Sequence, residues 1–471
     1  MAASQSGDSF ADRHIGPRPG EIDDMLKTLG LATLNDLTVK TVPPSILKPG
    51  GYEAPPMSEA QALTRLRAMA DRNVIAKTMI GMGYSGCITP PVILRNVLEN
   101  PGWYTAYTPY QAEISQGRME ALMNYQQTII DLTGMELANA SLLDEGTAAA
   151  EAMTLMRRVG KAKGQTLFVD AACHPQTIAV IETRAAPLGI PVTVGDPFTD
   201  LSGLGDDVYG LVLQYPATDG SVRDFRALTE QAHTAGALVT VAADLLSLVL
   251  LTPPGEWGAD IGGGSAQRFG VPMGFGGPHA AFMAAKDAFK RTLPGRLIGV
   301  SIDSRGKPAY RMALQTREQH IRREKATSNI CTAQVLLANI AGMYAVYHGP
   351  EGLKRIATNV QRLTAALAAG LISAGVTLAN ETFFDTLTAD LGDKGKADMV
   401  IAAARAKAIN LRDFGDGRVG MALDETTDEA DVQDVLAAFG VVDAKIDLDA
   451  PGGIPQALAR ATGFLDHPVF H

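Results

Sequence analysis

Short apolar runs alternate with amphipathic segments between about residues 77 and 329. Four of the runs have the length and composition of buried strands: 166–170, 192–194, 209–213 and 238–243. Three of the amphipathic segments place apolar residues at helical spacing: 146–158, 175–188 and 225–235. Because parallel strands need crossover helices, this alternation predicts an α/β fold with a mostly parallel sheet and helices on both faces.

The two ends of the chain have other patterns. Residues 21–29 and 59–72 are amphipathic and are separated by a proline-rich stretch, which predicts a helical arm. After residue 332, a long apolar helix leads into an alanine-rich helix at 353–374, followed by a mixed region. The pattern therefore predicts three parts: a helical arm (1–75), a large α/β domain (76–330) and a small α+β domain (331–471).

Composition and charge narrow the class of protein. The chain has 471 residues, of which 46% are hydrophobic and 20% charged, as is typical of a globular protein with a large core. The net charge of -10 argues against a general nucleic-acid surface, which would need a basic excess. One mixed-charge cluster at 317–325 could still bind an acidic partner, although a solvated helix face is an equally good interpretation.

The number of cysteines and the length of the apolar runs indicate the cellular compartment. Cys87, Cys173 and Cys331 are far apart and odd in number, which predicts neither a disulfide framework nor a metal site. No apolar run reaches the ~18 residues that a membrane span needs. Residues 1–16 lack the basic and apolar regions of a secretory signal. We therefore expect a cytoplasmic protein with no membrane segment.

One candidate phosphate site is the loop that opens the helix at 144–152. Gly146 allows close approach of the backbone, and Thr147 is a good helix cap whose hydroxyl can reach an anion. The free amides at a helix start attract phosphate. A simple helix cap is the alternative interpretation of the same residues.

Two further candidates follow the ends of predicted strands, where parallel sheets bind ligands. The ring of His174 could stack on a pyridine ring, and the carboxylate of Asp244 could hold a protonated pyridine nitrogen. Each residue could instead cap the helix that follows it.

Gln267 is the most informative position in this group. It follows Asp244 by 23 positions and precedes a glycine-rich stretch that ends at His279. A carboxylate followed roughly 20–30 residues later by a lysine is the order found in fold-type-I pyridoxal-phosphate (PLP) enzymes. Only a primary amine can form the Schiff base that holds this cofactor, and an amide nitrogen cannot. The sequence therefore predicts a vestigial cofactor pocket, formed by Gly146, Thr147, His174, Asp244, Gln267 and His279.

An aromatic loop carries a second set of candidates. Four aromatic residues lie within positions 103–110, in a stretch bounded by Pro and Gly, and Gln111 and Ser115 follow them. Tyrosine combines a flat apolar ring with a hydroxyl group, which suits interfaces and pockets. A loop that only packs against the fold is the alternative.

Several segments resemble the glycine cleavage system P-protein family. They span most of the chain: 13–17, 83–86, 104–118, 138–145, 265–282 and 313–332. The resemblance is to the amino-terminal half of the P-protein, in which the family has glutamine at the lysine position. It implies a PLP-dependent oxidoreductase that decarboxylates glycine and passes the aminomethyl group to the lipoyl group of H-protein. One departure is Gly262–Gly264, where strand-forming residues are usual, and we expect it to loosen that strand.

The resemblance also implies how this chain would act. The catalytic lysine, and most of the PLP site, would belong to a carboxy-terminal half or second subunit, and no catalytic residue is expected here. Residues of this chain would complete the pocket across the interface: Tyr84, Ser85, Tyr107, Tyr110, Gln111 and Ser115. Two alternatives stay open. The chain could be a non-catalytic scaffold or regulatory subunit, or an independent PLP enzyme that uses another lysine, such as Lys286 or Lys325.

Overall fold

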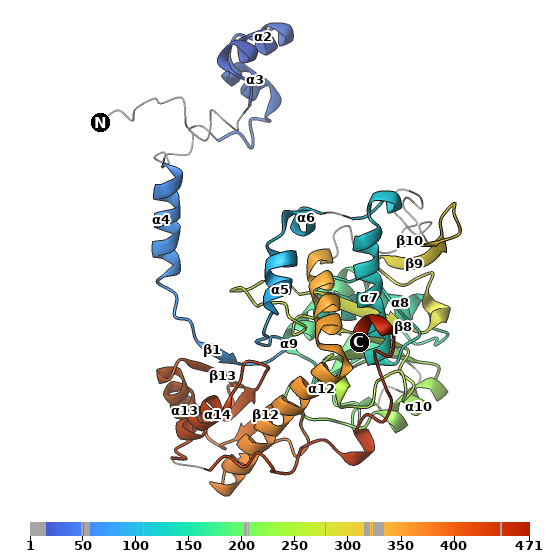
Figure 1. Ribbon diagram of the computed structural model, residues 1–471, viewed down its shortest axis with the longest axis vertical. Helices are drawn as coiled ribbons and strands as arrows, with labels where there is room; N and C mark the ends of the chain where they lie inside the picture. The colour runs from blue at the N-terminus through green and yellow to red at the C-terminus, as the bar shows by residue number, and fades with distance from the viewer. Residues whose placement is uncertain are drawn as a thin grey trace. The chain divides into compact units, whose positions relative to one another are not determined.

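The computed structural model describes residues 16–48, 50, 57–106, 108–201, 205, 207–277, 279–314, 321, 323, 334–442 and 445–471. The chain forms two compact units, Met1–Ile75 and Ala76–His471. Figure 1 shows the helices and strands of each unit. Among the described helices, none combines the length and the apolar character needed to cross a bilayer.

The first unit contains three helices: α2 (Pro19–Leu29), α3 (Leu34–Thr41) and α4 (Glu59–Ala70). Each begins with a hydrogen-bonded cap; in α3, for example, the hydroxyl of Thr33 accepts from the Asp36 amide at 3.1 Å. Gly30 ends α2 in the left-handed conformation. The predicted helices at 21–29 and 59–72 are confirmed, and α3 is an addition. Leu26 is the one buried side chain among the described residues of this unit, so its helices depend largely on their caps.

A seven-stranded sheet forms the centre of the second unit. Its strand order is β2-β8-β7-β6-β5-β3-β4, and β8 alone runs against its neighbours. The strands are β2 (Leu137–Ala138), β3 (Thr166–Asp170), β4 (Val192–Gly195), β5 (Val208–Tyr215), β6 (Leu238–Ala243), β7 (Ile261–Ser265) and β8 (Ala281–Ala285). The predicted mostly parallel sheet is confirmed.

Helices cover both faces of this sheet, because alternate side chains of each strand enter different hydrophobic clusters. Leu167 packs with α8 (Glu145–Val159) and α9 (Pro175–Ala185), whereas Phe168 packs in the cluster on the other face. That second cluster includes residues of α7 (Gln116–Thr133), α10 (Arg226–Thr234) and α12 (Val335–Ser373), among other elements. The arrangement confirms the predicted α/β architecture.

A smaller five-stranded sheet has the order β1-β13-β14-β12-β11. Its strands are β1 (Lys77–Met79), β11 (Thr377–Leu378), β12 (Thr386–Asp390), β13 (Ile409–Asp413) and β14 (Arg418–Ala422), and its helices are α13 (Lys394–Ala406) and α14 (Glu429–Ala438). Strand β1 pairs in parallel with β13. The chain therefore contributes one edge strand to the small sheet before it forms the large sheet, and it returns to the small sheet afterwards. Helix α12 bends at Gly349 and packs on both α7 and α14, which ties the two sheets together.

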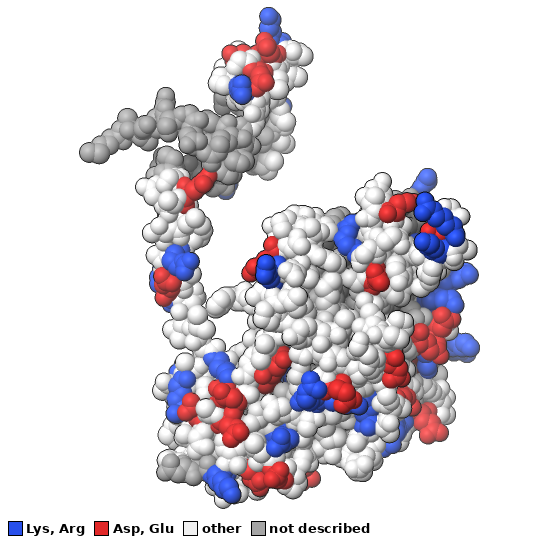
Figure 2. Space-filling view, in the orientation of Figure 1, with Lys and Arg blue, Asp and Glu red and all other residues white. Residues whose placement is uncertain are grey.

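An antiparallel hairpin of β9 (Leu297–Ile302) and β10 (Pro308–Ala313) stands apart from both sheets. Basic side chains gather over it on the face seen in Figure 2. Short helical turns fill the segment between β1 and α7, including α5 (Pro91–Ile93) and α6 (Pro101–Tyr104). Neither the hairpin nor these turns had been expected from the pattern of apolar residues.

Strand β7 corrects one expectation. Its three glycines do not loosen it, since β7 is fully buried and pairs with β6 on one side and with β8 on the other. A Cβ atom built on Gly264 would lie 2.2 Å from the carbonyl oxygen of Ala243. The absence of a side chain therefore lets this strand pack closely against its neighbour.

Candidate functional site

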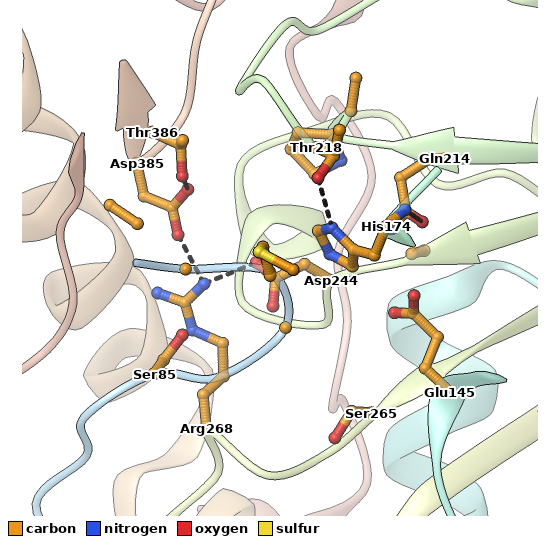
Figure 3. Close-up of a pocket in the computed structure, with 17 residues that line it drawn as sticks. Ser85, Glu145, His174, Gln214, Thr218, Asp244, Ser265, Arg268, Asp385 and Thr386 are labelled. Carbon is orange, nitrogen blue, oxygen red and sulfur yellow. Dashed lines mark hydrogen bonds and ion pairs between the residues drawn. The ribbon is translucent and has the colours of Figure 1, made fainter. Parts of the chain in front are cut away.

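A small cavity lies where the parallel strands of the large sheet end (Figure 3). Its volume is about 60 Å³, and His174, Asp244 and Ser265 line it from the large sheet. The loop at 81–85 and Asp385 at the start of β12 close it from the other side. The cavity has the position that a ligand takes in an open α/β sheet.

Arg268 carries the main positive charge in this cavity. Its Nη1 atom lies 2.9 Å from Asp244 Oδ2 and 2.6 Å from Asp385 Oδ2, and its side chain is almost fully buried. Burial raises the pKa of Asp244, and the guanidinium of Arg268 partly opposes that shift. The carboxylate that we expected to hold a pyridine nitrogen is therefore already paired with an arginine.

The start of α8 is also occupied by the chain's own side chains. Asp144 is the N-cap, and its Oδ1 accepts from the amide of Thr147 at 2.7 Å. The Thr147 hydroxyl accepts from the Asp144 amide and donates to the Asp144 carbonyl. The interpretation of Thr147 as the cap is thus wrong, because it occupies the third position of the helix. The carboxylate of Asp144 thus takes one of the amides that a phosphate at this helix start would use.

Glu145, the next residue, faces the cavity. Its Oε1 accepts from the Thr177 hydroxyl at 2.9 Å. Removal from water raises the pKa of its carboxyl from 4.5 to about 7, although the hydrogen bonds of Thr177 and Gln214 oppose the shift. Near neutral pH this group is therefore poised between its acid and its anion.

We expect Glu145 to give the chain a measurable pH dependence. Between the ordinary pKa of 4.5 and the folded value of about 7, the folded chain binds more protons than the unfolded chain. The stabilisation is therefore complete below pH 4.5 and is lost as the pH rises through 7, by up to about 3 kcal/mol. Glu145→Gln cannot ionise, so its thermal unfolding midpoint should fall less over this range than that of the wild type. Equal slopes for the two proteins would contradict the prediction.

His174 lines the cavity as predicted, but the chain covers its ring. Its Nδ1 lies 2.9 Å from the hydroxyl of Thr218, which also accepts from Arg412. Burial and then the charge of Arg412 lower the pKa of His174 to about 4, so the ring is neutral at physiological pH. A Cβ atom on Gly83 would be 3.6 Å from Cδ2 of the ring, so the backbone of the 81–85 loop lies beside this histidine.

Gln267 lies behind the cavity wall and is bound on all sides. Its Nε2 donates to the carbonyls of Ser85 at 2.8 Å and Val271 at 2.7 Å, and its Oε1 accepts from the Ser85 amide at 3.0 Å. His279 bonds to Ser265 through Nδ1, 2.6 Å from the Ser265 hydroxyl, and its ring meets the edge of Tyr84. The structure thus brings Tyr84 and Ser85 together with Gln267 and His279.

These observations test whether the pocket fits PLP. Gln267 has no amine, Arg268 is paired with Asp244, and Asp144 occupies the Thr147 amide at the start of α8. No lysine is among the described residues that line the cavity, and Lys286 pairs with Asp260 elsewhere. Ligand pockets usually have about 300–1,000 Å³, and this cavity has about 60 Å³. The residues present therefore do not fit the cofactor. The described part of the chain also has no group of three metal-ligating side chains.

The aromatic loop lies partly on the surface. Tyr110 is 48% exposed, and its hydroxyl accepts from Arg296 Nη2 at 3.0 Å. Gln111 is exposed, whereas Ser115 is buried and accepts from Arg118 Nη2 at 2.9 Å. Tyr107 lies outside the described residues, as does Lys325. Tyr110 and Gln111 are thus available to a partner, and Ser115 supports the start of α7.

Sequence reasoning missed Arg268 and Asp385. A cation directly after the lysine position was the available signal for Arg268, since a buried carboxylate such as Asp244 needs a partner. Asp385 lies 117 positions beyond Arg268 and belongs to the small sheet, so no spacing rule could have found it.

Comparisons with known proteins agree on one family. The profile described as Glycine cleavage system P-protein matches residues 12–439. A glycine dehydrogenase (decarboxylating) of Stutzerimonas stutzeri is 60% identical, over 100% of this chain and 49% of its own length. One of Gluconobacter oxydans is 58% identical, over 98% of this chain and 49% of its own length. The chain thus spans about half the length of these curated relatives.

Solved structures show the same fold. A crystal structure of glycine decarboxylase (P-protein) of the glycine cleavage system, in inhibitor-bound form, is 35% identical with a TM-score of 0.80. The match covers 90% of this chain and 99% of that one. A serine palmitoyltransferase of S. paucimobilis is 16% identical with a TM-score of 0.52, over 77% of this chain and 86% of its own, and shares the fold alone. The predicted fold-type-I class is confirmed.

Proposed function

The chain belongs to the glycine cleavage system P-protein family, and from this premise we propose that it is the amino-terminal half, or first subunit, of a PLP-dependent glycine decarboxylase. The complete enzyme would decarboxylate glycine and pass the aminomethyl group to the lipoyl group of H-protein. The Schiff-base lysine and most of the PLP site would belong to the carboxy-terminal half, where the cofactor supplies an electron sink.

The observation that carries this proposal is the self-filled pocket. Arg268 pairs with Asp244, and the carboxylate of Asp144 binds the Thr147 amide in the first turn of α8, so the chain's own charges lie where the pyridine nitrogen and the phosphate would be held. A chain with this fold and this filled site would depend on a partner for the cofactor. The cytoplasmic location remains a prediction from the sequence.

Exposed apolar side chains on neighbouring loops support a partner surface. They include Tyr84 and Ile88 between β1 and α5, Tyr110 and Ile114 before α7, and Phe275, which is 85% exposed. In Figure 2, charged side chains are sparse over and beside α6, in the same part of the chain. Large apolar groups exposed in this way are typical of interaction sites. We assign this surface to the carboxy-terminal half.

Contacts inside the chain link the two loops that would reach the partner. Tyr84 meets His279, which is two residues from Ala281, and Ala281 pairs with Leu142. The Ala140 amide donates to the carbonyl of Arg296, whose side chain binds Tyr110. Tyr84, Ser85, Tyr107, Tyr110 and Gln111 would then seal the partner's pocket from water, while Ser115 would hold α7 in place.

Alanine replacements at Tyr84 and Tyr110 test this function in the pair reconstituted with the carboxy-terminal half. We expect each to lower kcat for CO2 release from glycine, with lipoylated H-protein present, by about 10- to 100-fold, because a poorly closed pocket misplaces the reacting groups. Leu188→Ala is the control, since Leu188 is 56% exposed just before β4, at the opposite edge of the sheet. Unchanged turnover together with weaker assembly of the pair would favour the scaffold alternative.

A further inference from the structure

The carboxamide of Gln267 forms hydrogen bonds through both its oxygen and its nitrogen. Its donor and acceptor form a reciprocal pair with the backbone of Ser85, and its second donor reaches Val271. The residue is 2% exposed, so a missing partner would leave buried polar groups unpaired. A lysine offers donors but no acceptor, and an ionised glutamate offers acceptors but no donor. Only the amide group satisfies both atoms of Ser85.

The loop that Gln267 holds has an unusual backbone. Gly81, Met82 and Gly83 have successive φ values of +71°, +60° and +85°. The left-handed region is costly for a residue such as Met82, so the surrounding structure must hold this conformation. Ser85 lies two positions after Gly83 and is the point at which Gln267 fixes the chain.

Other contacts hold the rest of the loop from two sides. The hydroxyl of Thr89 donates to the Gly270 carbonyl at 2.7 Å, and the thiol of Cys87 lies 3.1 Å from the Val271 carbonyl. From the small sheet, Asp424 accepts from the Gly86 amide and Glu425 accepts from the Ile88 amide. Of the side-chain bonds to the loop backbone, the one from Gln267 is the closest in sequence to Tyr84.

The same segment also supports the side chain of Tyr84. The ring centroids of Tyr84 and His279 are 4.4 Å apart at 88°, and Tyr84 stays 44% exposed. The Ser265 hydroxyl bonds to His279 and accepts from the backbone amide of Gln267 at 3.1 Å. Residues 265–267 therefore fix both the backbone of Ser85 and the ring of Tyr84.

We propose that Gln267 is a positioning residue for the active site of the partner half. In place of the Schiff-base lysine, its carboxamide holds Tyr84 and Ser85 in the geometry that closes the partner's pocket. The inference rests on the proposed function and extends it. The glutamine at this position would have a positioning role of its own, in addition to lacking the amine that forms a Schiff base. It separates the roles of two neighbours, since Arg268 fills the old cofactor site and Gln267 shapes the loop.

The test uses Gln267→Glu and Gln267→Met in the reconstituted pair. Glutamate has nearly the same shape but faces two carbonyls without a donor, and methionine removes both functions. We expect kcat for glycine decarboxylation to fall about 10-fold with a smaller change in KM, because the loop acts after glycine has bound. The absorption spectrum of PLP in the pair should also shift as water enters the pocket. In the chain alone, amide hydrogen exchange at 84–86 should accelerate.

Thr89→Val is the matched control, because it removes a neighbouring bond of the same segment and leaves the Ser85 pair intact. If both Gln267 variants match Thr89→Val in kcat, spectrum and exchange, the inference is overturned, whether or not Tyr84→Ala is impaired. If Tyr84→Ala and Tyr110→Ala are also fully active, the proposed function fails as well. Should Gln267→Glu not fold, the exchange and kinetics of Gln267→Met decide the matter.

Discussion

Replacing Arg268 with alanine should lower the free energy of unfolding by about 3–5 kcal/mol. The guanidinium pairs with Asp244 and Asp385, and all three side chains are buried or mostly buried. Without it, two carboxylates would face one another in a small cavity, and the cost of keeping either of them charged and unpaired would be large. Because Asp244 directly follows β6 and Asp385 directly precedes β12, the variant should also loosen the contact between the two sheets.

Thermal and denaturant unfolding of the isolated chain would measure this effect. Arg226→Ala is the control, because Arg226 forms a similar pair with Asp224 at 2.5 Å, but both side chains are about half exposed. Loss of an exposed pair should cost about 1 kcal/mol or less. A triple variant that combines Arg268→Met with Asp244→Asn and Asp385→Asn should recover much of the lost stability. Equal losses for Arg268→Ala and Arg226→Ala would show that the buried pairs do not stabilise the chain.

The sequence was sufficient for the parallel centre of the large sheet and for the place of the site, but not for β2 or the antiparallel β8. The strands at 166–170 and 238–243 have the predicted bounds, because a mostly apolar run marks clearly where a buried strand begins and ends. The rule that ligands bind beyond parallel strand ends then placed His174 and Asp244 beside one cavity. Chemistry alone identified Gln267 as a residue that cannot bind an aldehyde.

What fills the site could not be predicted, because it depends on contacts between distant segments. Asp385 reaches Arg268 from the small sheet. The loop at 81–85, which lies beside His174, follows β1, and β1 pairs with the distant strand β13. The error at Thr147 had a local cause. Asp144 and Thr147 are both good capping residues and lie three positions apart. In the structure Asp144 is the N-cap, and Thr147 completes the capping box by accepting from the Asp144 amide.

The glycines of β7 show why a local rule failed, and they provide a second large effect. Glycine is usually a weak strand former, which suggested a loosened strand. A Cβ on Gly264, however, would lie 2.2 Å from the Ala243 carbonyl oxygen and 2.9 Å from the ring of Phe282. A Cβ on Gly263 would meet nothing closer than the Phe282 carbonyl oxygen at 3.6 Å. Adjacent glycines of one strand should therefore respond in opposite ways.

Gly264→Ala should lower the free energy of unfolding by about 3 kcal/mol or more, because backbone atoms in a fully paired sheet cannot move aside. Gly263→Ala should change it by less than about 1 kcal/mol, and in the stabilising direction, since alanine loses less conformational freedom on folding. Unfolding midpoints of the two variants, measured under the same conditions, would test the pair. If Gly264→Ala were as stable as Gly263→Ala, close approach of β6 and β7 could not be the reason for glycine there. A loss of stability in Gly264→Ala alone would mean that this glycine permits the close approach of β6 and β7 next to Ser265, which lines the cavity.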